Sequence, residues 1–241
     1  MRTILAGPAN PSTTDDYRTA GETHLLVTTV SKTSEPRGDA ALELYWLPLG
    51  AGRGNQVVRL SGHLYEWLAA RRGGREPQAL FHSALRVRLG EVRYVIEMAP
   101  VWSSKIPDRG VVREGPVGSR WLGRARLFRY EVRRWRDGII DDVAYAVDSP
   151  VRISTDPELS ERLLDQVPAF PTATWGLDEF GTGEMWNSNS LISWLLASSG
   201  HDIDGIVPPH DGRAPGWHAG MVRSDMQMSA TYAQPTCGTE Q

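Results

Sequence analysis

The sequence predicts an α+β fold, in which an antiparallel β-sheet forms the core and helices pack against it. The main observation is a hairpin. Residues 80–89 and 92–98 both alternate apolar and polar side chains, and Gly90-Glu91 between them forms a two-residue turn. The second observation is that strand-like and helix-like segments are grouped along the chain. This grouping is typical of α+β domains and lacks the regular strand–helix alternation of a doubly wound fold.

The other elements follow from the spacing of the apolar residues. Alternation predicts strands, a period near 3.6 predicts helices, and clusters of Gly and Pro mark connections. In chain order we expect strands over 42–49 and 57–60, a helix over 64–72, the hairpin, a strand over 125–135, a short helix over 141–147, a helix over 157–167 that Asp156 caps, and a helix that begins at Asn187 or Ser188 and stops at Gly200. Residues 101–123, 168–183 and 208–218 are expected to be loops.

The length and composition fit one folded domain with irregular ends. The chain has 241 residues, of which 40% are hydrophobic and 23% are charged, as in ordinary globular proteins. Residues 1–40 are rich in Thr, Ser, Pro, Gly and Asp and are expected to form a flexible N-terminal arm. Residues 41–223 form the expected single α+β domain, and residues 224–241 the expected disordered tail.

The charge and the cysteine count argue against several classes of partner. A net charge of −3 gives no attraction to nucleic acid or to an acidic membrane surface, so the arginines over 124–136 are expected to form a solvated strand face. Cys237 is the single cysteine, which excludes disulfides within the chain. No apolar run is long enough to span a bilayer, and the N-terminus lacks the apolar core of a signal peptide. The expected location is cytoplasmic.

Two groups of titratable residues have no assigned chemistry. His201, His210 and His218 have aspartates nearby, but their spacing matches no metal motif, so loop composition explains them better and no metal or other cofactor is expected. Asp141-Asp142 is a carboxylate pair whose partner the sequence does not place.

The helix that opens at Asn187-Ser188 contains the first candidate for chemistry. Leu191, Ile192 and Leu195 form its apolar stripe, and Ser188 precedes Ile192 by four residues. Ser188 therefore lies on the inner edge, at the positive end of the helix dipole. Nucleophiles of active sites often occupy this position.

The hairpin contains the second and third candidates. If Leu89 lies opposite Val92, then His82 and Glu97 are diagonal neighbours on one face of the sheet. A carboxylate beside an imidazole can fix its tautomer and stabilise the imidazolium. The same face carries arginines, including Arg86. A buried site there therefore requires a helix that covers only the His82 end, or a bulge that rotates the strand.

These patterns resemble the circularly permuted papain-like proteins of the NlpC/P60 superfamily, including its LRAT-like and PPPDE-type members. The resemblance covers roughly residues 80–200. It rests on Phe81-His82-Ser83-Ala84 at the start of a strand and on Asn187-Ser188-Asn189-Ser190 at the start of a helix. It implies a permuted papain-like fold with His82 as general base and Glu97 as orienting residue, and it puts Ser188 at the cysteine position of the family. The chain also resembles uncharacterised actinobacterial proteins, which implies no activity.

The serine at position 188 leaves three interpretations open. A thiol can ionise at a helix N-terminus, whereas a serine hydroxyl needs an aligned base and an oxyanion hole. The first interpretation is a hydrolase or acyltransferase that acts on an amide or ester through Ser188, His82 and Glu97. The second is a catalytically inactive remnant whose pocket binds a small molecule or peptide. The third is that Ser188 is only a helix N-cap. The sequence specifies neither the substrate nor the oligomeric state.

Overall fold

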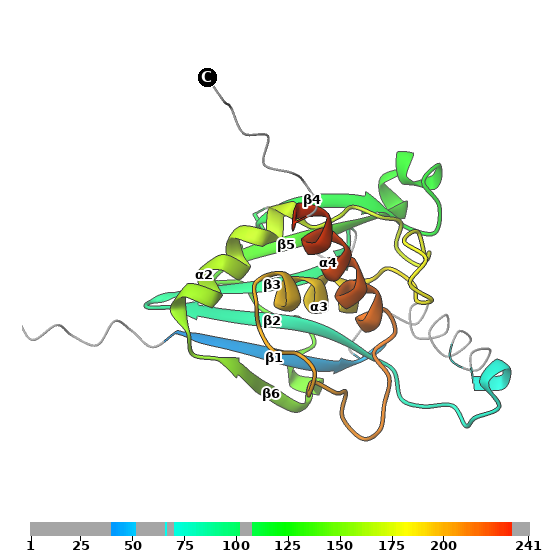
Figure 1. The fold of residues 1–241 in the computed structure, drawn as a ribbon, viewed down its shortest axis with the longest axis horizontal. Helices are drawn as coiled ribbons and strands as arrows, with labels where there is room; N and C mark the ends of the chain where they lie inside the picture. Colours follow the sequence, from blue (N-terminus) through cyan, green and yellow to red (C-terminus); the bar gives the residue numbers. More distant parts are fainter. Residues whose placement is uncertain (1–39, 52–65, 67–69, 102–107, 233–241) are drawn as a thin grey trace, which may run out of the picture. The chain divides into compact units, whose positions relative to one another are not determined.

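The protein contains one antiparallel sheet of six strands in the order β4-β5-β3-β2-β1-β6 (Figure 1). The computed structural model describes residues 40–51, 66, 70–101 and 108–232. The strands are β1 (Ala41–Pro48), β2 (Phe81–Leu89), β3 (Val92–Pro100), β4 (Val111–Pro116), β5 (Arg129–Arg136) and β6 (Val147–Ser154). The predicted α+β class, with an antiparallel sheet and packed helices, is confirmed.

Helices α2 (Pro157–Gln166) and α3 (Ser188–Ser198) pack against one face of this sheet, and α4 (Trp217–Tyr232) packs on α3 (Figure 1). Their shared core is made of buried apolar side chains, with Leu42, Leu85 and Ile96 from the sheet and Leu163 and Leu195 from the helices among them. Asp156 caps α2 as predicted, because its carboxylate accepts hydrogen bonds from the first-turn N–H groups.

The opposite face of the sheet carries a smaller apolar cluster that includes Leu47, Ala84 and Val95. No helix contributes to this cluster among the described residues; Ile140, from the connection between β5 and β6, completes it. Because side chains alternate along a strand, His82 on β2 and Glu97 on β3 belong to this second face.

The predicted hairpin is confirmed, including its register. Leu89 lies opposite Val92, and the pairing of β2 with β3 continues as far as Leu85 opposite Ile96. Beyond that pair the two strands take different partners. β2 stays paired with β1 through His82 opposite Leu47, while β3 stays paired with β5. The end of the sheet therefore opens between β2 and β3.

Three expectations for the middle of the chain are wrong. The short helix over 141–147 is instead a 3-10 turn at Val143–Tyr145 followed by strand β6. The connection over 101–123 contains a strand, β4. The strand expected from residue 125 begins at Arg129, because 3-10 turns occupy 122–124 and 126–128.

Helix α4 was not expected, since 208–218 was predicted to be a loop and the tail was predicted to begin at 224. The helix starts at Trp217 and continues to Tyr232. Its contact with α3 depends on Gly220, where an added Cβ would lie 2.1 Å from Ser193 Oγ. Three expectations fall wholly or mostly outside the described residues. They are the arm over 1–40, of which only residue 40 is described, the strand over 57–60 and most of the helix over 64–72.

Candidate functional site

Helix α3 begins with a capping box in which Asn187 is the N-cap. The Asn187 Oδ1 accepts hydrogen bonds from the backbone N–H of Asn189 at 2.9 Å and of Ser190 at 3.4 Å. The Ser190 hydroxyl accepts in return from the Asn187 N–H at 3.1 Å. Ser188 is therefore the first helical residue, and the interpretation that Ser188 is only an N-cap is wrong.

Asn189 fixes the start of α3 against the strand that carries His82. Its Oδ1 accepts from Ser83 Oγ at 2.8 Å, and its Nδ2 donates to the carbonyls of Phe81 and Pro215, both at 2.9 Å. Because Phe81 and Ser83 flank His82 on β2, these buried hydrogen bonds set the position of Ser188 relative to His82.

The side chains that neighbour Ser188 make hydrogen bonds that hold the start of α3 in place, whereas the Ser188 hydroxyl makes none among the described residues. Its side chain makes no hydrogen bond to another described residue, although Ser188 is only 5% exposed. Its backbone N–H likewise has no partner in the described part of the chain. Both groups lie at the positive end of the α3 dipole, where negative charge is stabilised.

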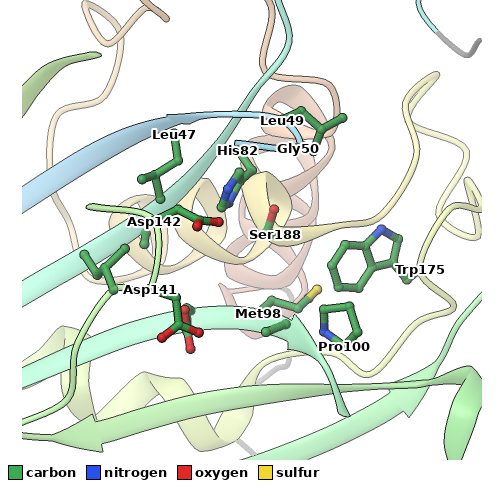
Figure 2. Close-up of a pocket in the computed structure, with 14 residues that line it drawn as sticks. Leu47, Leu49, Gly50, His82, Met98, Pro100, Asp141, Asp142, Trp175 and Ser188 are labelled. Carbon is green, nitrogen blue, oxygen red and sulfur yellow. The ribbon is translucent and has the colours of Figure 1, made fainter. Parts of the chain in front are cut away.

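A pocket of about 120 Å³ opens where β2 and β3 separate. His82, Glu97 and Ser188 all contribute to its wall, so the structure brings the three predicted residues to one cavity. Figure 2 shows Ser188 and His82 between the Asp141–Asp142 segment and Trp175. The remaining lining residues are Leu47, Leu49, Gly50, Ala84, Met98, Ala99, Pro100 and Ile140.

Ser188 and His82 reach this pocket from opposite faces of the sheet. Ser188 comes from the helix-covered face, and His82 comes from the face that carries the arginines. A buried site on the His82 face therefore forms without a covering helix and without a bulge in β2. The strands β2 and β3 separate at this end, and the segment around Ile140 covers the second face.

The His82 imidazole is neutral at neutral pH. Burial lowers its pKa from 6.5 to about 4, because a charged ring would lose much of its hydration in this pocket. The ring makes no hydrogen bond to another described residue. One of its nitrogens is therefore available to accept a proton from a group in the pocket.

Glu97 lies on the His82 face as predicted, but its hydrogen bond goes to a different residue. Its Oε1 accepts from an Arg133 guanidinium nitrogen at 2.6 Å, across the β3–β5 pairing. Arg133 also contacts Glu131 at 3.1 Å, and Glu131 in turn binds Arg109. No hydrogen bond joins Glu97 to His82 in the described structure, so the orienting role of Glu97 stays a prediction.

The electrostatics of Glu97 reflect this position. Burial raises the pKa of its carboxyl group, while Arg133 acts in the opposite direction. The carboxylates of Asp141 and Asp142 raise the Glu97 pKa further. Arg133 is fully buried, so the expectation of a solvated arginine face over 124–136 is wrong for this residue.

Asp141, Asp142 and Trp175 are pocket residues that the sequence did not assign to a site. Burial raises the pKa of Asp142, and the neighbouring Asp141 raises it further. The only sequence signal for these two was their adjacency. The backbone N–H of Trp175 donates a hydrogen bond to the Pro116 carbonyl at 2.9 Å, which holds this residue beside the pocket, and no sequence pattern indicates this.

The other histidine candidates lie apart from one another. His201 is buried, with its Nδ1 2.8 Å from Ser199 Oγ, and His210 is exposed near Asp148. Among the described residues no group of three or more His, Cys, Asp and Glu side chains has the arrangement of a metal site. Within the same residues, no helix combines the length and apolar composition required to cross a bilayer.

Comparison with protein-family models, curated proteins and solved structures finds no match for this chain.

Proposed function

We propose that the protein is an acyl hydrolase or acyltransferase that acts on an amide or ester. The Ser188 Oγ attacks the carbonyl carbon while His82 takes the hydroxyl proton. A bond forms between Ser188 and the acyl group, the bond to the leaving group breaks, and His82 returns the proton to the leaving group. Water or another acceptor then attacks the acyl-serine and loses its proton to His82. The bond between the acyl group and the Ser188 oxygen breaks, and His82 passes the proton to that oxygen.

The observation that carries this proposal is the contrast between Ser188 and its neighbours. The side chains of Asn187, Asn189 and Ser190 have partners that hold the helix in place. Ser188 is buried, its hydroxyl has no partner among the described residues, and it shares a pocket with a neutral imidazole. A serine hydroxyl that makes no structural hydrogen bond and faces a pocket beside a neutral imidazole is available to react with a bound substrate.

The start of α3 also supplies a group that can stabilise the reaction intermediate. The attacked carbonyl oxygen becomes an oxyanion, which needs hydrogen-bond donors that are already oriented. The Ser188 N–H and the positive end of the helix dipole favour negative charge at this place. Glu97 could orient His82 through its second carboxylate oxygen after a side-chain rotation, or through a bridging water, while its Oε1 keeps the hydrogen bond from Arg133.

A catalytically inactive binding protein is the second candidate. The ion pair between Glu97 and Arg133 favours it, because the carboxylate that would orient His82 has another partner. In this case the pocket binds a small molecule or a peptide side chain, and the resemblance to permuted papain-like enzymes reflects ancestry alone.

Ester hydrolysis distinguishes the two candidates. We expect the wild-type protein to hydrolyse short p-nitrophenyl esters and Ser188→Ala to lose at least about 100-fold in kcat/KM. Ser198→Ala is the matched control, because Ser198 lies in the same helix and its hydroxyl donates to the Trp194 carbonyl. Equal hydrolysis by the wild type and Ser188→Ala would refute Ser188 as the nucleophile.

A further inference from the structure

We infer that this pocket selects a substrate whose inserted group is a small organic cation, an ammonium or a guanidinium. The inference rests on the proposed function, since it names the substrate class of the same site. It is carried by two pocket carboxylates that have no ion-pair partner among the described residues, by the size and apolar surface of the cavity, and by the hydroxyl of Ser188, which has no partner among the same residues.

Among the described residues, the titratable groups that face the pocket are His82 from β2, Glu97 from β3, and Asp141 and Asp142 from the connection between β5 and β6. His82 is uncharged at neutral pH. Glu97 belongs to an ion-pair chain in which the carboxylates of Glu97 and Glu131 are matched by two guanidinium groups. This chain adds no net charge to the pocket.

Asp141 and Asp142 are the acidic residues of the described pocket wall that lie outside this ion-pair chain, and Asp141 is exposed to water. Neither forms an ion pair with another residue in the described ranges. Asp142 is half-buried, and its carboxylate is disfavoured both by this burial and by the adjacent charge of Asp141. A cation in the pocket would relieve both effects, whereas an anion would add to the repulsion.

The remaining wall suits the hydrocarbon part of a small cation. Leu47, Met98, Ile140 and Trp175 give the cavity an apolar surface. A dry cavity of roughly 150 Å³ holds a benzene molecule, so about 120 Å³ admits a group slightly smaller than that ring. A short alkylammonium or alkylguanidinium chain has this size, and a bulky polycyclic group does not.

Ser188 is an independent indication that a polar ligand enters this cavity. Its side chain is more than nine-tenths buried, has no partner among the described residues, and points into the pocket in Figure 2. The hydroxyl at one side and the two carboxylates at another define a ligand that has both a hydrogen-bonding atom and a positive charge.

Calorimetric titration of the wild-type protein tests the inference, because none of the probes has an amide or ester bond that the protein could cleave. The probes are n-butylammonium, the neutral and nearly isosteric n-butanol, and the anion butyrate. We expect the ammonium to bind at least about tenfold more tightly than n-butanol, and butyrate to bind most weakly. Equal or tighter binding of n-butanol or butyrate, or no measurable binding of the ammonium at millimolar concentration, would overturn the inference.

Substitutions that remove one negative charge show which carboxylate causes the preference for the ammonium probe. Asp142→Asn, made in the same background, should weaken ammonium binding at least about fivefold and leave n-butanol binding within about twofold. Asp141→Asn, which changes an exposed residue, should also weaken ammonium binding. Glu91→Gln, in the exposed turn at the far end of the hairpin, is the matched control and should change nothing.

Failure of this inference and failure of the proposed function give different results. Unchanged ammonium affinity in both aspartate variants would refute the cation preference, whatever the protein does to esters. An inactive wild-type protein that still prefers the ammonium probe would refute the proposed catalysis and leave the cation preference intact.

Discussion

The His82 imidazole should make the folded protein progressively less stable as the pH falls below neutrality. In the folded state burial lowers the His82 pKa from 6.5 to about 4, so the unfolded chain binds a proton that the folded chain does not. Because the folded-state pKa is the lower of the two, this contribution to stability is fully present above about pH 6.5, declines as the pH falls, and is lost by about pH 4. His82→Gln removes this titration.

The size of the effect follows from the two pKa values. Each pH unit between them changes the free energy of unfolding by about 1.4 kcal/mol, so going from about pH 7 to about pH 5 lowers the wild-type stability by about 2 kcal/mol more than that of His82→Gln. Burial also lowers the His201 pKa, but His201 is present in both proteins and its contribution cancels in the comparison.

Urea denaturation followed by tryptophan fluorescence at the two pH values measures this difference. His218→Gln is the control, because His218 is exposed. On acidification this variant should lose as much stability as the wild type does. If His82→Gln and the wild type lose equal stability on acidification, His82 titrates as a hydrated histidine and the argument that burial lowers its pKa is refuted.

Three further substitutions test the scaffold around the site. Asn189→Ala should lower the free energy of unfolding by about 2–4 kcal/mol, because it leaves several buried partners unpaired; a loss below about 1 kcal/mol in urea denaturation would contradict this. Gly220→Ala should cost at least about 2 kcal/mol in the same assay, because its Cβ would strike Ser193 at the α3–α4 contact, whereas Gly205→Ala has open space and should not. Ser188→Cys should react with iodoacetamide at neutral pH at least about tenfold faster than free cysteine, because the helix N-terminus favours the thiolate; slower alkylation at position 188 would count against the site geometry.

The sequence predicted the parts of the fold that depend on local contrast between apolar and polar residues. In the hairpin the alternation and the Gly90-Glu91 turn specify both the strands and their register, and Gly90 adopts the positive φ of 57° that such a turn uses. In α3 the capping residues precede a continuous apolar run, so the start and the buried face are both visible in the sequence.

Helix α4 escaped prediction because its buried positions carry small residues. Gly220 and Ser224 within the helix, and Gly216 just before it, recur every four residues and allow the backbone to approach the start of α3 and α3 itself closely, but they give no hydrophobic contrast. Strands β4 and β6 escaped for a related reason. Both are edge strands with several exposed positions, and proline occurs in each of them.

The candidate site could be predicted only in part, because its geometry depends on pairing between distant segments. The face shared by His82 and Glu97 follows from the hairpin register alone. The hydrogen bond between Arg133 and Glu97 requires the pairing of β3 with β5, which no local pattern specifies. The approach of Asp142 to the same pocket depends on the path of an irregular connection, which hydrophobic periodicity does not indicate.

Covalent labelling with a fluorophosphonate probe, mapped by peptide mass spectrometry, tests most directly whether Ser188 is an activated nucleophile. We predict that the wild-type protein takes up one label at Ser188, that Ser188→Ala takes up none, and that His82→Gln reacts at least about 100-fold more slowly. Ser198→Ala should react as the wild type does. A wild-type protein that resists the probe, or labelling that survives Ser188→Ala, would contradict the catalytic role of this serine.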